Sequence, residues 1–367
     1  MKILSVFLKI IKWFSICLIG IILILTIGIF FSKGVNHKKY KITGENSINE
    51  SQYIMLGGIE QFIQIRGKSK DNPVILFLHG GPGNPISFYS YYYQEHLLND
   101  YTFVSWEQRG SGRTYYRNKS DNTDLSLERL LLDIDELVQY IKERFGLDKI
   151  IIMGHSWGTI LGILYMNEYP ENISQYIGVS QGVNFNEGRL YSGRKALEIA
   201  IGKNNIKDET ELKRLLEECA KHIDYNSLNV ANHVNLVNLT VKYLKAENAN
   251  PMKEIWVALT SPDLEFNDLK WLVSAMSNYE NVFSLLSPLM DKLFSFNIYD
   301  YPIEDNIPIT FIAGSSDWIT PMEMVNDYYV KQKTENKKLI IMQGMGHSPF
   351  LDNQKQFSER VIEILKR

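Results

Sequence analysis

The segment that most constrains the fold is residues 149–159, where two apolar runs are joined by the turn Gly-His-Ser-Trp-Gly. The first run, residues 150–153, is short and rich in β-branched side chains, which is typical of a strand buried on both faces. The second, residues 159–166, is apolar enough for a buried helix, which we expect to end before Pro170. A Gly-x-Ser-x-Gly turn in this context predicts a sharp strand-to-helix connection with Ser156 as a candidate nucleophile.

The same alternation of strand and helix extends over much of the chain. Ser126 is a suitable N-cap for a helix with a single apolar stripe, and Gly146 lies just past its expected end. Apolar runs predict further strands at residues 53–56, 59–65, 74–78, 102–106, 173–180, 309–313 and 339–342. Strands that alternate with helices predict a mainly parallel sheet with helices on both faces, an α/β fold.

The alternation is interrupted in the second half of the chain. Residues 184–297 carry few strand signals and predict helices, whereas strands resume at residue 309. We therefore expect a core made of residues 50–183 and 298–367, with residues 184–297 inserted as a helical lid. Residues 33–51 are polar and rich in Lys and Asn, and we interpret them as a linker.

The N-terminal segment predicts a membrane anchor. Residues 13–31 carry no charge, and as a helix these 19 residues would extend over roughly 28 Å, about the thickness of a hydrocarbon core. We expect residues 1–32 to be an uncleaved single-pass transmembrane helix with the catalytic part outside the cytoplasm. A cleaved signal peptide is the alternative, although its apolar region is usually shorter. Lysines flank both ends, so charge hardly decides the orientation.

Composition excludes other classes of function. The net charge of −3 gives no indication of nucleic-acid binding. The two cysteines, Cys17 and Cys219, are too few for a disulfide framework or a cysteine-based metal cluster. We expect neither a metal nor another cofactor.

Two further residues complete a candidate catalytic triad. A serine hydroxyl needs a base within hydrogen-bonding distance, and the base needs a third group to hold its tautomer. Asp317 follows the strand at 309–313, and His347 follows the strand at 339–342. Both therefore lie at the carboxyl ends of core strands, where open α/β sheets hold their ligands. The order Ser156, Asp317, His347 is also the one expected after such a turn.

Acyl transfer also requires two backbone N–H groups that meet the negative oxygen of the transition state. Trp157, directly after the candidate nucleophile, supplies one. The loop His-Gly-Gly-Pro-Gly at residues 79–83 follows a strand, and its glycines allow the backbone to come close. We assign the second donor to Gly81.

Three motifs together resemble the proline iminopeptidase family, serine peptidases of the α/β-hydrolase fold. They are His-Gly-Gly-Pro-Gly at 79–83, Trp-Glu-Gln-Arg-Gly-Ser-Gly-Arg-Thr at 106–114, and Gly-x-Ser-Trp-Gly at 154–158. The resemblance covers the core on both sides of the lid. It implies an α/β-hydrolase fold, the triad Ser156, Asp317 and His347, and release of an N-terminal residue, often proline, from short peptides.

The chain departs from that family at three points. His155 stands where the family usually has glycine and is common in esterases and lipases, Glu107 replaces the usual aspartate, and the N-terminal anchor is not part of the family pattern. Arg109 and Arg113 are expected to hold their loop by pairing with Glu107.

The leading hypothesis is a membrane-anchored serine aminopeptidase acting on small peptides. An esterase or lactonase acting on a small acyl substrate is one alternative, and a non-catalytic binding protein on a hydrolase scaffold is another. An aminopeptidase must pair the positive N-terminus of its substrate with a carboxylate. Glu187, at the entrance to the lid, is the candidate for that role, and Phe185, Tyr191 and Trp271 are candidates for a pocket wall.

Overall fold

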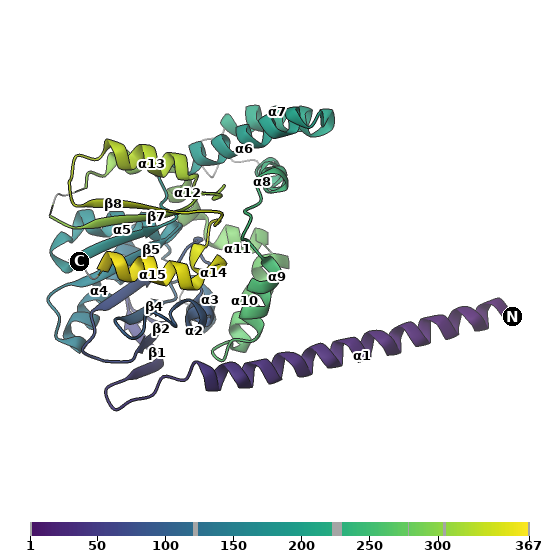
Figure 1. The fold of residues 1–367 in the computed structure, drawn as a ribbon, viewed down its shortest axis with the longest axis horizontal. Coiled ribbons are helices and arrows are strands. Elements are labelled where there is room, and N and C mark those ends of the chain that lie inside the picture. Colours follow the sequence, from purple (N-terminus) through teal and green to yellow (C-terminus); the bar gives the residue numbers. More distant parts are fainter. Residues whose placement is uncertain (1, 120–123, 222–229, 278, 304–305, 366–367) are drawn as a thin grey trace.

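The computed structural model describes residues 2–119, 124–221, 230–277, 279–303 and 306–365. Within them, eight strands form one sheet in the order β1-β2-β4-β3-β5-β6-β7-β8 (Figure 1). Strands β1, β2 and β4 pair antiparallel, and all other neighbours pair parallel. The strands are β1 (Ile48–Leu56), β2 (Ile59–Gly67), β3 (Val74–Leu78), β4 (Thr102–Trp106), β5 (Ile150–His155), β6 (Ile173–Val179), β7 (Ile309–Gly314) and β8 (Lys337–Met342). The predicted mainly parallel sheet is confirmed.

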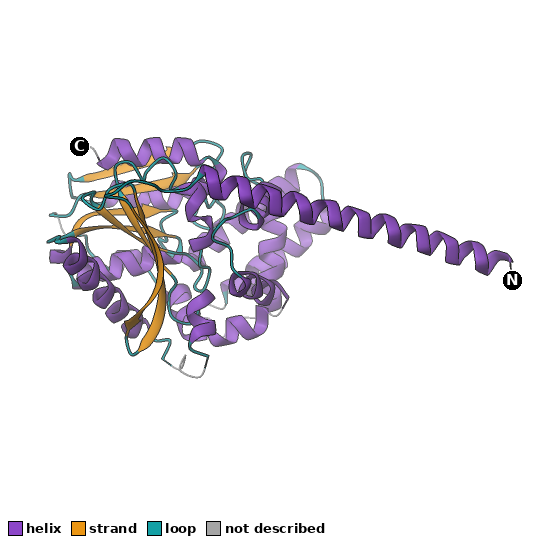
Figure 2. Cartoon of the chain, turned by 90° about the horizontal axis from the view of Figure 1, so that it is seen from below, coloured by secondary structure: helices purple, strands orange, loops and turns teal. Residues whose placement is uncertain are grey.

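The central strands are apolar throughout because both faces of the sheet are covered (Figure 2). In β3, Leu76 and Leu78 pack into one core, whereas Ile75 and Phe77 pack into the core on the opposite face. This alternation follows from the two-residue period of a strand. One face is covered by α4 (Leu127–Phe145), α5 (Trp157–Glu168) and α13 (Met322–Lys331), and the other by α2 (Ser90–Tyr93), α14 (Pro349–Asp352) and α15 (Gln354–Leu365).

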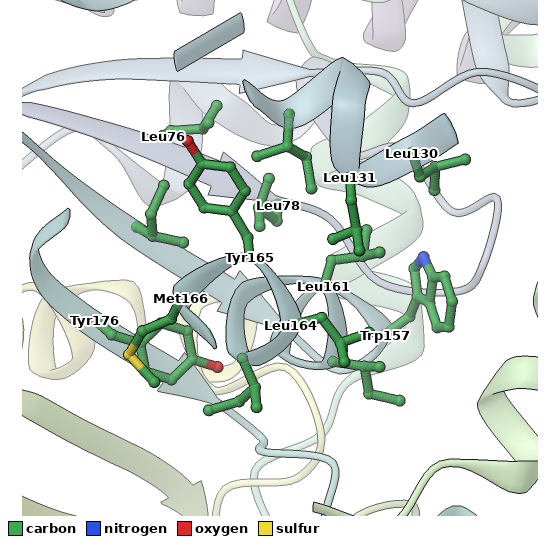
Figure 3. Close-up of a cluster of buried hydrophobic side chains, with 14 of the residues drawn as sticks. Leu76, Leu78, Leu130, Leu131, Trp157, Leu161, Leu164, Tyr165, Met166 and Tyr176 are labelled. Carbon is green, nitrogen blue, oxygen red and sulfur yellow. The ribbon is translucent and has the colours of Figure 1, made fainter. Parts of the chain in front are cut away.

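Helix α4 begins and ends at the predicted residues. The Ser126 hydroxyl accepts the backbone N–H of Arg129 at 3.2 Å, and Gly146 takes the left-handed conformation with φ of 63°. Its apolar stripe packs on α5, as Figure 3 shows for Leu131 beside Leu161. Helix α5 is thus enclosed between α4 and the sheet, which explains why its sequence is apolar on all sides.

Seven helices lie between β6 and β7 in the described residues, and we refer to this insertion as the lid. They are α6 (Phe185–Gly202), α7 (Ile206–Ala220), α8 (Val230–Tyr243), α9 (Pro251–Leu259), α10 (Phe266–Ser277), α11 (Tyr279–Leu285) and α12 (Ser287–Ser295). An isolated antiparallel bridge between Asn184 and Asn297 joins the two ends of this insertion. Helices α6, α7 and α8 enclose a small apolar core of their own.

The N-terminal helix α1 (Lys2–Lys39) extends away from the body of the molecule (Figure 1). It is long and apolar enough to cross a membrane, although a signal sequence would meet the same criterion. It continues past residue 32, and β1 begins at Ile48, so the prediction of a linker over residues 33–51 is wrong. The Lys33 ammonium donates to the Leu264 carbonyl at 2.9 Å, and the Asn36 amide donates to the Thr260 carbonyl at 3.0 Å. The end of α1 therefore rests on the lid.

Candidate active site

Ser156 lies at the sharp turn between β5 and α5. Its backbone has φ of 53° and ψ of −118°, a left-handed conformation that is strained for a residue with a side chain. The turn requires glycine on both sides. A Cβ atom on Gly154 would lie 2.4 Å from the Gly158 carbonyl oxygen, and one on Gly158 would lie 2.0 Å from that of Leu78. The sequence therefore forms the turn that the Gly-x-Ser-x-Gly pattern predicts.

The structure joins Asp317 and His347 by a hydrogen bond. Asp317 follows β7, His347 follows β8, and the His347 Nδ1–H donates to Asp317 Oδ2 at 2.9 Å. The carboxylate is buried and also accepts the backbone N–H groups of Ile319 and Thr320 and the Thr320 hydroxyl. Burial raises the pKa of Asp317, but His347 and the Thr320 donors outweigh burial and hold this pKa below its usual value. Asp317 is thus an ionised group that orients His347.

The loop of His347 is held against the turn that carries Ser156. His155 donates its Nε2–H to the His347 carbonyl at 2.8 Å, and the Ser180 hydroxyl donates to the same oxygen at 2.9 Å. In the described part of the chain, the Ser156 hydroxyl makes no hydrogen bond to His347. In enzymes without substrate such bonds are often long and shorten only when substrate binds. The three expected residues thus converge on one end of the sheet.

The two segments that carry the candidate oxyanion donors lie next to Ser156. Trp157 is the first residue of α5, so its backbone N–H has no partner within the helix. The 79–83 loop approaches from β3, because a Cβ atom on Gly80 would lie 3.2 Å from that of Ser156. Gly81 has φ of 119°, a conformation that favours glycine. The N-terminus of α5 and the loop at residues 79–83 thus both lie beside the nucleophile.

The loop after β4 forms hydrogen bonds both to the 79–83 loop and to Trp157 of α5. The Gln108 backbone N–H donates to His79 Nε2 at 3.2 Å, and its side-chain amide donates to the His79 carbonyl at 3.1 Å. The Trp157 indole N–H donates to the Gln108 side-chain oxygen at 3.2 Å. Gln108 is therefore a positioning residue. Its motif was visible in the sequence, but only the fold shows that it contacts both the 79–83 loop and α5.

Of the two arginines of that motif, Arg113 forms the expected ion pair with Glu107, whereas Arg109 does not. Arg109 pairs with Asp133 of α4 at 2.5 Å, so its predicted pairing with Glu107 is wrong. Arg113, in α3 (Gly112–Arg117), lies 3.7 Å from Glu107 but binds the lid residue Asp268 more closely, at 2.7 Å. Arg113 is buried, so it joins the core to the start of α10 through a desolvated ion pair.

The pocket at Ser156 is narrow, with a volume of about 10 Å³. It is lined by Ser156, Trp157, Ile160, Gln181, Gly182, Val183, Asn184, Phe185, Leu293, Ile319, Thr320, Pro321 and Met324. None of these described lining residues is acidic. Among the three aromatic candidates, only Phe185 belongs to this lining. Trp271 donates its indole N–H to the Gly83 carbonyl at 2.9 Å and so holds the lid on the 79–83 loop.

The structure does not bring Glu187 to this pocket. Its side chain is 62% exposed and lies 3.9 Å from Arg194 on the surface of α6. Together with Tyr191 and Glu323 it lines an open groove that shares Val183, Asn184 and Met324 with the lining of the Ser156 pocket. Glu187 was predicted to lie near the site because it follows soon after β6. It belongs to the first turn of α6, however, and this turn directs its side chain to solvent.

Three histidines have a lowered pKa in the folded protein, so we expect the fold to be less stable in mild acid. Burial lowers the pKa of His155 to about 3, and of His79 and His233 to about 4, from 6.5 in the unfolded chain. Their contribution is complete above pH 6.5 and is lost as the pH falls, by about 2 kcal/mol for each histidine at pH 5. Glu107 acts in the opposite direction, because burial raises its pKa to about 7. We expect the three histidines to outweigh this one carboxyl. Thermal unfolding at pH 7 and pH 5 checks this, and a midpoint that does not fall at pH 5 contradicts it.

Comparison with known proteins defines the class. Residues 73–354 match the model of the α/β-hydrolase fold family, so the chain belongs to that family of hydrolases. A probable aminopeptidase of Bacillus subtilis (strain 168) is 26% identical over 322 residues, which cover 86% of this chain and 96% of the relative. A proline iminopeptidase of Lactobacillus delbrueckii subsp. bulgaricus is 22% identical over 86% of this chain and 97% of its own. The resemblance found in the motifs is thus confirmed.

Solved structures agree with the fold. A proline iminopeptidase-related protein of Thermus thermophilus superimposes with a TM-score of 0.57 at 18% identity, covering 87% of this chain and 98% of its own. A putative lipase of Acinetobacter baumannii gives a TM-score of 0.58 at 19% identity, covering 92% and 95%. Both likenesses concern the fold alone.

Proposed function

We propose that this protein is a serine hydrolase in which Ser156 is the nucleophile, His347 the base and Asp317 the residue that orients it. The observation that carries the proposal is the hydrogen bond between buried Asp317 and His347, together with the hydrogen bond that joins the His347 loop to the strained turn at Ser156. We further propose that it acts as an aminopeptidase that releases an N-terminal residue, proline or another small apolar one, from short peptides. The aminopeptidase and proline iminopeptidase names of its relatives support that class.

The proposed reaction is based on the hydrogen bond between Asp317 and His347. Because Asp317 accepts the Nδ1–H, His347 presents Nε2 as an acceptor, and it takes the proton of Ser156 Oγ during attack on the carbonyl carbon. The N–H groups of Trp157 and Gly81 stabilise the oxygen as it becomes negative. His347 then protonates the leaving group, and a water molecule attacks the acyl-enzyme by the reverse sequence of proton transfers.

An esterase or lactonase is the second candidate, because the described residues that line the Ser156 pocket include no carboxylate to pair with a substrate amine. Glu187 therefore has no place in this proposal as the structure stands. A lid movement that brought an acidic side chain inward would be needed for strict aminopeptidase specificity.

A substrate comparison distinguishes these proposals. The purified protein would be assayed on Pro-, Ala- and Leu-naphthylamides, on their N-acetylated forms and on short p-nitrophenyl esters, beside Ser156→Ala. An aminopeptidase should cleave the free-amine naphthylamides at least ~10-fold faster than the acetylated ones. Equal rates on both, with faster ester cleavage, would establish the esterase instead. Absence of turnover on every substrate would favour a binding protein. EDTA should not change the rates.

We also propose that α1 is a single-pass membrane anchor and that the catalytic part lies outside the cytoplasm. The full-length protein should remain in the membrane fraction after salt and carbonate washes. Deletion of residues 1–32 should release a soluble, active enzyme, because the contacts of Lys33 and Asn36 with the lid are retained. Protease added to intact cells should digest the catalytic part. Full-length protein in the soluble fraction, or a mature N-terminus near residue 35, would argue against the anchor.

A further inference from the structure

A second cavity adjoins the pocket at Ser156. It has a volume of about 190 Å³ and lies between lid helices α6 and α8 and the loop that follows Asp317. Phe185 and Ile319 line both this cavity and the Ser156 pocket, so the two spaces adjoin at these residues. Most of the cavity wall is apolar, and its polar groups come from Arg189, Ser192, His233 and Thr240.

Arg189 is unusual because it is a buried cation with no acidic partner. It is only 6% exposed, and none of the ion pairs in the described part of the chain involves it. Its guanidinium donates to the Asn186 side-chain oxygen at 2.9 Å, to the Cys219 carbonyl at 3.3 Å and to His233 Nδ1 at 3.0 Å. Among the described residues, its Nε–H has no hydrogen-bond partner. A buried charge that is neither neutralised nor fully hydrogen-bonded is costly to the fold, which indicates that a ligand completes it.

His233 offers a second donor on the same wall. Its Nδ1 accepts from the Arg189 cation, so the ring proton is on Nε2. The ring is largely enclosed, packed beside Phe294 with centroids 5.6 Å apart and beside Phe185 with centroids 6.5 Å apart. The Ser192 and Thr240 side chains are almost fully buried and add hydroxyl groups to the lining. The cavity therefore combines one positive charge and several donors with apolar walls.

We infer that Arg189 and His233 form a subsite for a carboxylate of the substrate that is cleaved at Ser156. The arrangement suits this chemistry because a guanidinium binds a carboxylate in a charge-assisted manner, and the enclosing apolar walls strengthen the contact. The inference rests on the proposed hydrolase function but not on the peptidase specificity. The carboxylate can belong to the acyl part of the substrate or to its leaving group, as in the C-terminus of a dipeptide.

Two substrate pairs that differ only in the anion distinguish these sources. Mono-p-nitrophenyl glutarate against p-nitrophenyl valerate tests the acyl side, and Pro-Gly against Pro-Gly amide tests the leaving-group side. The full-length enzyme should prefer the anionic member of one pair by on the order of 10- to 100-fold in kcat/KM, mainly through a lower KM, which is the range for one hydrogen bond to a charged group. Arg189→Gln should abolish that preference. If neither peptide is cleaved but the ester preference is present, the peptidase proposal fails and the subsite stands.

Arg194→Gln is the matched control, because Arg194 lies on the same helix but is 55% exposed on the surface. It should keep the preference of the wild type. A preference that is absent from both pairs in the wild type, or that persists in Arg189→Gln, would overturn the inference. A second measurement needs no variant. Glutarate should inhibit cleavage of p-nitrophenyl acetate competitively and at least ~10-fold more strongly than glutaramide, and equal inhibition by the two would also overturn it.

Discussion

Replacing Ser156 with alanine should lower kcat/KM by on the order of 10³-fold or more on every substrate that the enzyme cleaves. The hydroxyl oxygen forms the covalent bond to the acyl group, so no other side chain at the turn can take over its role. The variant should fold normally, because Ser156 is held by its backbone: its N–H donates to the Val179 carbonyl, and its side-chain oxygen makes no hydrogen bond in the described structure. Substantial remaining activity would contradict the assignment of the nucleophile.

The proposed mechanism also predicts how the effects of Ser156→Ala and His347→Ala combine. If the two act as a unit, His347→Ala should cost about as much as Ser156→Ala, and the double variant should be little worse than either single one. Steady-state kinetics on one p-nitrophenyl ester and one naphthylamide would measure all three. Additive losses in the double variant would show that the two residues act independently, which the proposed mechanism does not allow.

The local features of the fold could be predicted because each depends on neighbouring residues in the chain. Ser126 and Gly146 cap the two ends of α4 through contacts within a few residues of those ends. The turn at Ser156 needs only its two flanking glycines and the apolar runs beside them. Asp317 and His347 were found because any residue directly after a parallel core strand lies at the same edge of the sheet.

The N-terminal region was predicted less well for two physical reasons. Strand β1 is at the edge of the sheet, and only its end residues Ile48 and Leu56 are buried. Its first half, rich in Asn, Glu, Ser and Gln, therefore resembles a linker. Helix α1 continues to Lys39 although its last residues are polar, and Lys33 and Asn36 of this part contact the lid. Those contacts join residues more than 200 positions apart, which no local pattern reveals.

The partners of the charged side chains also could not be predicted from the sequence. Arg113 pairs with Asp268, which is 155 positions away in the chain. Arg189 contacts His233 only because α6 and α8 pack together. Glu187 shows the converse. Its place after a core strand resembles that of Asp317, but it lies in the first turn of a helix, where the helical rotation rather than the strand decides the direction of the side chain. Sequence position thus locates a residue near a site without determining its orientation.

Asp317→Asn should reduce kcat by on the order of 10⁴-fold, the loss expected when the base is held in the wrong tautomer. Asp317 Oδ1 accepts the backbone N–H groups of Ile319 and Thr320 at 2.9 and 3.0 Å, so the oxygen of an asparagine must occupy that position. The amide NH₂ then faces His347 in place of Oδ2. Since an N–H cannot accept from another N–H, Nδ1 of His347 becomes the acceptor, and its proton moves to Nε2. The ring can no longer take the Ser156 proton.

The same loop supplies a matched control for this prediction. Asp352 Oδ2 accepts the Gly346 backbone N–H at 2.7 Å, next to His347, and an asparagine oxygen can accept that bond equally well. Asp352→Asn should therefore lose less than ~10-fold, as is usual for a conservative change outside the reacting atoms. Thermal midpoints at pH 7 for both variants would show whether the fold is retained. A folded Asp317→Asn enzyme that remains within ~10-fold of the wild type would mean that His347 is oriented by another group, because the hydrogen bond to Asp317 is what fixes its tautomer in the proposed mechanism.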